Sequence, residues 1–312
     1  MENLLLSFNV VAPLIVYMAI GYLLRRFRVV EERAFTQISQ IVFYAAIPAL
    51  CFQNIRVLDF QSVFSNSIAL QMAAAIVIVF TIIILVVPRF CKENARRGVL
   101  IQGLFRTNDG VFGLAVAETL LGAANIGIMV VCIAVTIPLY NMLGVAEMEY
   151  FRGGKPNIGK ILVRLIKNPI ILGCLAGLVF GVFQWRVPQF LDKPLSGIAG
   201  ICAPLGFMAL GGALSFDSLA DNRKALGWVC AMKLVLIPAA VLTAFYLMGM
   251  RGDPLLVALI IFGGPTAMSV YPMACSMNGD AKLAGGIVAL TSTLSLLTIF
   301  GFIFLLKQTG VA

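Results

Sequence analysis

A run of polar residues, Arg106-Thr107-Asn108-Asp109-Gly110, interrupts an otherwise apolar stretch of the chain. Thr, Asn and Asp favour helix N-termini because their side chains accept hydrogen bonds from free backbone N–H groups. A helix that stops near Arg106 and restarts near Asn108–Gly110 would present such groups, together with a partial positive charge. Arg106 adds a cation that can hold a carboxylate through two parallel hydrogen bonds. This run is therefore expected to bind an anion.

A second interruption is centred on Gly263-Gly264-Pro265-Thr266. The glycines permit a non-helical bend, and Pro265 suits the first position of a new helix. The two interruptions correspond at an offset of 156 residues, half of the 312-residue chain, and three more pairs share that offset: Pro13 and Pro169, Gly21 and Gly177, Pro48 and Pro204.

We predict that both breaks form one substrate site. Its predicted residues are Arg106, Thr107, Asn108, Asp109, Gly110, Gly264, Pro265 and Thr266, beside an apolar wall of Val111, Phe112 and Met268.

The elements that position these residues are membrane-spanning helices. The chain is 61% hydrophobic and 12% charged, against roughly 45–50% and 25% in soluble domains. Ten stretches are apolar and long enough to be transmembrane helices, and the gaps between them leave no room for a soluble domain. They are Leu6–Leu24, Ala34–Gln53, Ser67–Val87, Val99–Leu121, Ile126–Val145, Pro169–Trp185, Leu195–Leu214, Ala225–Met248, Leu255–Met277 and Leu283–Leu306.

Basic residues mark the orientation of these spans. Of the 23 Lys and Arg residues, 16 follow odd-numbered spans, which places those loops in the cytoplasm and both termini outside. The net charge of +9 is thus a topology signal, and no nucleic-acid partner is expected. Each half carries five spans, so the second half enters the bilayer from the opposite face. We predict an all-α polytopic protein of two inverted five-helix repeats, residues 1–156 and 157–312, with broken fourth and ninth spans and a site near the midplane.

Ionisable residues within the spans are candidates for function, because each costs about 2.5–3.5 kcal/mol to insert. Arg106 and Asp109 are spaced to form an ion pair on a helix as an alternative to binding a ligand. Glu118 is close enough to a span end to be solvated. Lys233 either extends its ammonium group to the cytoplasmic face or acts as a partner of Asp109 or as a coupling group.

The sequence has no histidine, which excludes a His-based proton relay, a His-ligated metal and a Ser-His-Asp hydrolase. Proton coupling would then run through Asp109, Glu118 or Lys233. A sodium site is an alternative, although Ser and Thr in spans more often bond their own helix. Its candidate ligands are Asn125, Thr136, Asn141, Thr291, Ser292, Thr293 and Ser295. The seven cysteines are scattered, and no cofactor or metal is expected.

Several stretches resemble the auxin efflux carrier family, which includes plant carriers and bacterial malate and malonate permease-like proteins. These stretches are Leu104–Gly122, Gly21–Leu50, Lys233–Ala239 and Gly263–Thr298. The resemblance implies a scaffold of spans 1, 2, 6 and 7, a transport domain of spans 3–5 and 8–10, and a homodimer formed through the scaffold. It also implies that Asn108 meets the substrate carboxylate and that Pro265 is the crossover proline. Ala115 departs from the family pattern, which has proline there.

The leading functional hypothesis is a secondary transporter that moves small organic anions (carboxylates) across the plasma or inner membrane by alternating access. One alternative is a sodium- or proton-coupled organic anion symporter of the bile-acid carrier type. A non-transporting membrane sensor and an intramembrane enzyme are remoter alternatives. The enzyme alternative rests on Asn278-Gly279-Asp280, which matches only part of an aspartyl protease element, and the chain is predicted not to be an enzyme.

Overall fold

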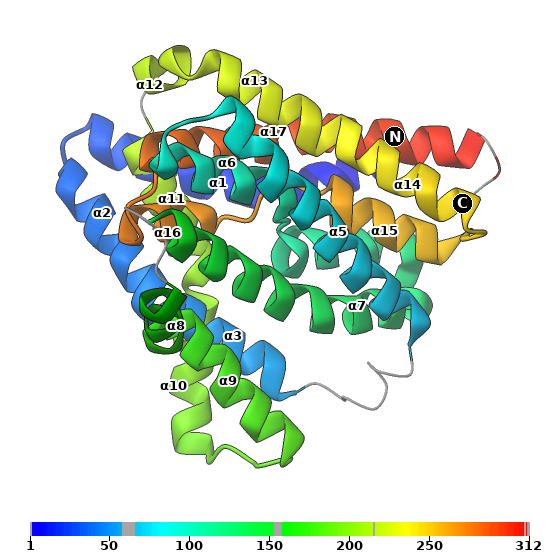
Figure 1. The fold of residues 1–312 in the computed structure, drawn as a ribbon, viewed down its shortest axis with the longest axis horizontal. Helices are drawn as coiled ribbons and strands as arrows, with labels where there is room; N and C mark the ends of the chain where they lie inside the picture. The colour runs from blue at the N-terminus through cyan, green and yellow to red at the C-terminus, as the bar shows by residue number, and fades with distance from the viewer. Residues whose placement is uncertain (1, 58–65, 153–157, 215, 309, 311–312) are drawn as a thin grey trace.

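The computed structural model describes residues 2–57, 66–152, 158–214, 216–308 and 310, and within these ranges the chain is helical with no β-strand. The predicted all-α class is therefore correct (Figure 1). The predicted boundary between the halves, after residue 156, lies outside the described residues.

The first half forms α1 (Glu2–Arg26), α2 (Glu32–Ile41), the π-helical turn η1 (Val42–Ala46), α3 (Ile47–Arg56), α5 (Ser67–Phe90), α6 (Asn94–Phe105), the π-helical turn η2 (Asp109–Gly113) and α7 (Leu114–Phe151). The second half forms α8 (Ile158–Lys167), α9 (Pro169–Val182), α10 (Gln189–Gly200), α11 (Cys202–Ala213), α12 (Phe216–Asp221), α13 (Arg223–Ala231), the π-helical turn η3 (Met232–Leu236), α14 (Ile237–Leu247), α15 (Asp253–Gly263), α16 (Val270–Ser276) and α17 (Ala281–Gln308). Gly122, at a φ of 72°, divides α7 into two helices at the predicted junction of spans four and five.

Six continuous helical segments of the described residues are long and apolar enough to cross a membrane: Glu32–Arg56, Ser67–Phe90, Asn125–Phe151, Gln189–Ala213, Arg223–Leu247 and Ala281–Gln308. Two shorter apolar helices, Pro169–Val182 and Asp253–Gly263, accompany them. The chain is thus a multi-pass helical protein, while the arrangement of ten spans in inverted repeats stays a prediction.

Helical segments begin at corresponding places in the two halves. The segments that start at Ser67 and Arg223 are 156 residues apart, as are those that start at Asn125 and Ala281.

Local sequence explains where two helices begin. The Asn66 side chain accepts a hydrogen bond from the N–H of Ile68 at 3.0 Å, and Asn168 caps α9 immediately before Pro169. Asparagine at the N-cap and proline at the first helical position are both favoured there.

The helices pack in two groups. The first helix group contains α1, α2, α3, α9, α10 and α11, in which α1 packs on α11 and α3 on α9. The second helix group contains α5, α6, α7, α13, α14, α15, α16 and α17. In Figure 1, α3, α9 and α10 lie at the lower left, whereas α5, α7, α14 and α15 lie towards the right.

Glycines allow the first helix group to pack backbone against backbone. Gly21 of α1 faces the backbone of Met208, and Gly211 of α11 faces the backbone of Met18. On the other pair of helices, Gly173 of α9 faces the backbone of Pro48. Small residues of this kind let helices approach closely in a membrane, where van der Waals packing drives association.

Each half also contains a helix that breaks. α6 ends at Phe105 and helical turns resume at Asp109, in agreement with the predicted first break. α15 ends at Gly263, but the next helix begins only at Val270. The prediction that Pro265 occupies the first position of that helix is therefore wrong. Pro265 instead lies in extended chain, where its carbonyl is free to accept a hydrogen bond from the other break.

The two breaks cross and pair with each other. The backbone N–H of Asn108 donates to the carbonyl of Pro265 at 2.9 Å, and Thr107 and Thr266 form an isolated antiparallel bridge. The Thr266 hydroxyl donates to the carbonyl of Gly103 at 2.8 Å, near the end of α6. Irregular backbone at membrane depth needs partners within the protein, and the two breaks supply them to each other.

The glycine crossing of α1 and α11 yields a prediction about stability. A methyl group at Gly211 would overlap the backbone of Met18, which has little freedom to move. We expect Gly211→Ala to lower the free energy of unfolding by about 1–3 kcal/mol, measured as a lower Tm in detergent. Gly197→Ala on α10, where a methyl group meets nothing within 4 Å, is the control and should leave the Tm unchanged or slightly raised.

The crossing of the two breaks yields a second stability prediction. Thr266→Val keeps the shape of the side chain but removes the donor to Gly103, leaving a buried carbonyl unsatisfied at a cost of about 1–3 kcal/mol. We expect a lower Tm. Thr293→Val is the matched control, since Thr293 is exposed and its hydroxyl donates to the Ala289 carbonyl of its own helix at 2.9 Å. Equal effects of the two substitutions would contradict a structural role for the Thr266 hydrogen bond.

Candidate functional site

A cavity of about 310 Å³ lies beside the crossing, between the two helix groups. The first break contributes five consecutive residues to its wall, Arg106 to Gly110, and the first helix group contributes residues of α3 and α11. The remaining wall residues come mostly from α7 and the second break. Those from the first group are Ile47, Leu50, Cys51, Asn54, Ile55, Cys202 and Ala203, and those from α7 and the second break are Leu114, Val130, Ile133, Ala134, Ile137, Pro138, Tyr140, Asn141, Ala267, Met268 and Ser269.

Arg106 supplies a buried cation to this cavity. Its side chain is 3% exposed and contacts Gln102 Oε1 at 3.3 Å, Met273 Sδ at 2.8 Å and the Asn141 Oδ1 atom. No ion pair joins it to Asp109 among the described residues, so the alternative of an intrahelical pair is wrong. The break explains this, because the i,i+3 spacing brings side chains together only on a continuous helix.

Asn108 places an unused hydrogen-bond donor at the cavity. Its side chain is 7% exposed, and its Nδ2 atom has no hydrogen-bond partner in the described structure. Buried polar groups are nearly always paired. An amide donor left free in a cavity wall therefore fits an acceptor that arrives with a ligand, such as a carboxylate oxygen.

Asp109 lies at the start of η2 and is 1% exposed. Its Oδ2 atom accepts a hydrogen bond from the Thr136 hydroxyl at 2.7 Å, whereas its Oδ1 atom has no partner within the described residues. The site therefore combines one buried cation with one buried carboxyl group that is only half satisfied. A negative charge on Asp109 in this position would have to be removed by protonation or balanced by a nearby cation.

Lys233 is buried behind the crossing rather than extended towards the membrane surface. Its side chain is 1% exposed, and its Nζ atom donates to the Thr107 hydroxyl at 2.5 Å and lies 3.5 Å from the Phe262 carbonyl. The interpretation that its ammonium group reaches the cytoplasmic face is therefore wrong. Lys233 sits within η3, and π-helical turns inside α-helices often occur at functional sites. Its contacts brace both broken helices.

The second break meets the cavity through other residues than those predicted. Gly264, Pro265 and Thr266 are buried behind the wall, and Ala267, Met268 and Ser269 line it instead. The offset is a consequence of the late helix restart at Val270, which leaves a longer non-helical segment after Gly263.

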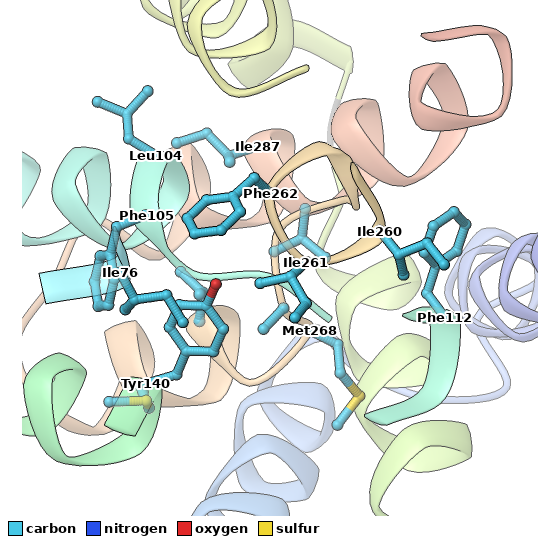
Figure 2. Close-up of a cluster of buried hydrophobic side chains, with 14 of the residues drawn as sticks. Ile76, Leu104, Phe105, Phe112, Tyr140, Ile260, Ile261, Phe262, Met268 and Ile287 are labelled. Atoms are coloured by element: carbon cyan, nitrogen blue, oxygen red, sulfur yellow. The ribbon is translucent and has the colours of Figure 1, made fainter. Parts of the chain in front are cut away.

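Of the predicted apolar wall, Met268 lines the cavity and Phe112 is buried behind it. The side chain of Val111 lies outside the described ones. Figure 2 shows Phe112 beside Ile260, and Phe105 and Tyr140 together on the other side of Met268. The apolar wall is thus continuous with the buried core.

The predicted coupling and sodium candidates are dispersed. Glu118 is exposed and does not line the cavity. Thr136 bonds Asp109, Thr291 bonds the Ile287 carbonyl of its own helix at 2.7 Å, and Asn125 bonds Asp253 at 2.8 Å on the surface. Ser292 is buried, and the Ser295 hydroxyl bonds the Ser292 carbonyl of the same helix.

Sequence reasoning missed two buried carboxyl groups near the end of α7, Glu147 and Glu149, and Glu147 is the one that contacts a neighbour of Arg106. Glu147 is 2% exposed and accepts a hydrogen bond from Gln102 Nε2 at 3.3 Å. Both were missed because the predicted fifth span ended at Val145, whereas α7 continues to Phe151. The apolar residues Val145, Met148 and Phe151, which are all buried, lie on one helical face and could have indicated this extension.

Comparison with known proteins adds to this geometry. The chain matches the family described as "Membrane transport protein" over residues 6–154 and 156–303. A "Putative malonate transporter" of Rhizobium meliloti is 23% identical over 308 residues, which cover 96% of each chain. An uncharacterized transporter of Methanocaldococcus jannaschii is 24% identical over 96% of this chain, and an auxin efflux carrier component of Arabidopsis thaliana is 29% identical over 42% of it.

These relatives are transporters rather than enzymes, in agreement with the prediction that the chain is not an enzyme. The resemblance inferred from the broken spans is thereby confirmed. With both matched segments together spanning nearly all of its length, the chain belongs to the membrane transport protein family, the family of the auxin efflux carriers.

Proposed function

We propose that this membrane transport protein is a secondary transporter that moves small organic anions, mono- or dicarboxylates, by alternating access. The observation that carries the proposal is the pairing of a buried guanidinium, Arg106, with the unpartnered amide of Asn108 in one cavity. A carboxylate can accept hydrogen bonds from both, and bonds to a charged partner are about twice as strong as neutral ones. The name of the Rhizobium meliloti relative is consistent with a dicarboxylate substrate.

The size and lining of the cavity also support a small anion. Its volume of about 310 Å³ is at the lower end for small-molecule sites, which are mostly apolar with a few placed polar groups. Here the first break supplies four consecutive polar residues, Arg106 to Asp109, whereas α3 and α11 supply mostly apolar ones. Gly110, the adjoining position, lacks a side chain that would cover the backbone N–H groups at the start of η2.

A second candidate, coupled symport, is favoured by Asp109. An anion bound beside an ionised carboxylate would be repelled, and the free Oδ1 atom of Asp109 can accept either a proton or a cation. If a proton or cation must bind Asp109 to remove that repulsion, the anion binds only together with the proton or cation.

The two helix groups are the elements that alternating access would move. We assign the first group to a scaffold and the second to a transport domain. Each half of the chain, as one of two inverted repeats of about 156 residues, contributes helices to both groups. The equal offset of helix starts supports this assignment, as does the division of the family match at residue 155. A homodimer formed through the scaffold, in the plasma or inner membrane, completes the proposed assembly.

The Asn108 amide provides the first functional test. Asn108→Ala removes the free donor, and we expect malonate to bind roughly tenfold to a hundredfold more weakly, the effect of losing about 1.5–3 kcal/mol from a hydrogen bond to a charged group. The measurement is the malonate-induced rise of Tm together with uptake into proteoliposomes. Asn54→Ala alters another asparagine of the same cavity, on α3, and should have a smaller effect. Unchanged binding in Asn108→Ala would contradict the assigned site.

The proposed topology has its own test. An even number of spans with the odd-numbered loops in the cytoplasm places both termini outside. Alkaline phosphatase fused to the C-terminus should therefore be active in cells, and green fluorescent protein at the same position should be dark. Fusions in the loop after α5, near Lys92, should give the opposite pattern. A fluorescent C-terminal fusion would contradict the proposed orientation.

A further inference from the structure

We infer that Glu147 is a proton-binding site whose occupancy is coupled to the anion through Gln102 and Arg106. This inference rests on the proposed function, because it requires an anion at Arg106. It assigns the coupling proton to a residue of α7 that lies away from the crossing and does not line the cavity.

A continuous polar chain joins Glu147 to the cavity. Gln102 Nε2 donates to Glu147 Oε2 at 3.3 Å and to the Gly144 carbonyl at 2.7 Å. The opposite end of the same amide, Gln102 Oε1, accepts from Arg106 Nη1 at 3.3 Å. All three side chains are buried, with exposures of 0%, 2% and 3% for Gln102, Glu147 and Arg106. The amide therefore links the cation of the site directly to a second carboxyl group.

Two glycines leave room for this chain. A methyl group at Gly144 would lie 2.9 Å from Gln102 Nε2 and 3.0 Å from Arg106 Nη1. One at Gly98, on α6, would lie 3.1 Å from Glu147 Oε1. That Oε1 atom has no hydrogen-bond partner within the described structure, so Glu147 retains a free position for a proton.

The electrostatic surroundings of Glu147 are simple. Of the two groups that face it, Gln102 of α6 is neutral, and Arg106, directly after α6, is charged. Arg106 in turn faces the Cys51 and Cys174 thiols of α3 and α9, the Tyr140 hydroxyl of α7 and the Asp109 carboxyl group of η2. Glu149, two residues along, is already paired with Arg152 at 2.8 Å and with Arg164 at 3.7 Å. Arg106 is therefore the counter-charge on which an ionised Glu147 depends.

Anion binding changes that counter-charge. A carboxylate at Arg106 neutralises the guanidinium, so the ionised form of Glu147 loses its compensation and takes up one proton from solvent. Linkage is reciprocal, so protonation of Glu147 tightens anion binding by the same factor. Anion and proton then bind together, which is the condition for proton-coupled symport.

Calorimetric titration of the purified full-length protein with malonate tests this coupling. Titrations in two buffers with different ionisation enthalpies give the number of protons taken up per malonate bound. We expect wild type to take up more protons than Glu147→Gln, by up to one per malonate. The malonate affinity of wild type should rise towards low pH by up to about tenfold per pH unit, and that of Glu147→Gln should vary less. The protonation of malonate itself contributes equally to all variants.

Glu149→Gln is the matched control, because it removes a buried carboxyl group from the same helix without touching Gln102, and it should keep the wild-type proton number. Gln102→Met is a second variant, independent of whether Glu147→Gln folds, and should also lower the proton number. If Glu147→Gln binds malonate with the same proton number as wild type, the inference about Glu147 is overturned while the proposed function stands. If Glu147→Gln does not fold, the same result in Gln102→Met has that meaning. Absence of malonate binding in wild type would overturn the proposed malonate site and the coupling together.

Discussion

The structure depends on how backbone groups are satisfied where two helices break. Inside a bilayer no water is available to bond a free N–H or carbonyl, so a broken helix must find partners within the protein. Here the partner of each break is the other break, through Asn108 and Pro265 and through the bridge of Thr107 with Thr266. This mutual requirement brings together residues from distant parts of the chain and places a cavity beside them.

Side chains of the second helix group then brace the crossing. Lys233 from η3 binds the Thr107 hydroxyl, and Thr291 from α17 accepts a hydrogen bond from the N–H of Thr266 at 3.2 Å. A lysine buried for this purpose is costly unless its charge is compensated. Its two contacts with oxygen atoms of the broken helices supply part of that compensation and explain why an ammonium group lies so far from solvent.

The sequence predicts the helical class, the position of the first break and the family, because each rests on local features: apolar length, the capping types at Asn108 and Asp109, and the motif spacing. Several partners of Arg106 and Lys233 lie instead on helices that are distant in the sequence, so local sequence features do not predict them. Glu147 was missed for a related reason. Its burial results from packing of α7 against α6, and a polar residue near a span end is otherwise expected to be solvated.

The bracing of the crossing has a mechanical consequence. The hydrogen bonds of Lys233 with Thr107, of Thr266 with Gly103 and of Thr291 with Thr266 all join residues of the second helix group. A displacement of that group as a rigid body would leave each of these bond lengths unchanged. The end of α6 and the start of η2 would then be carried through the membrane with their geometry intact, and the energetic barrier to movement would reside in the apolar surfaces that slide past α3 and α11.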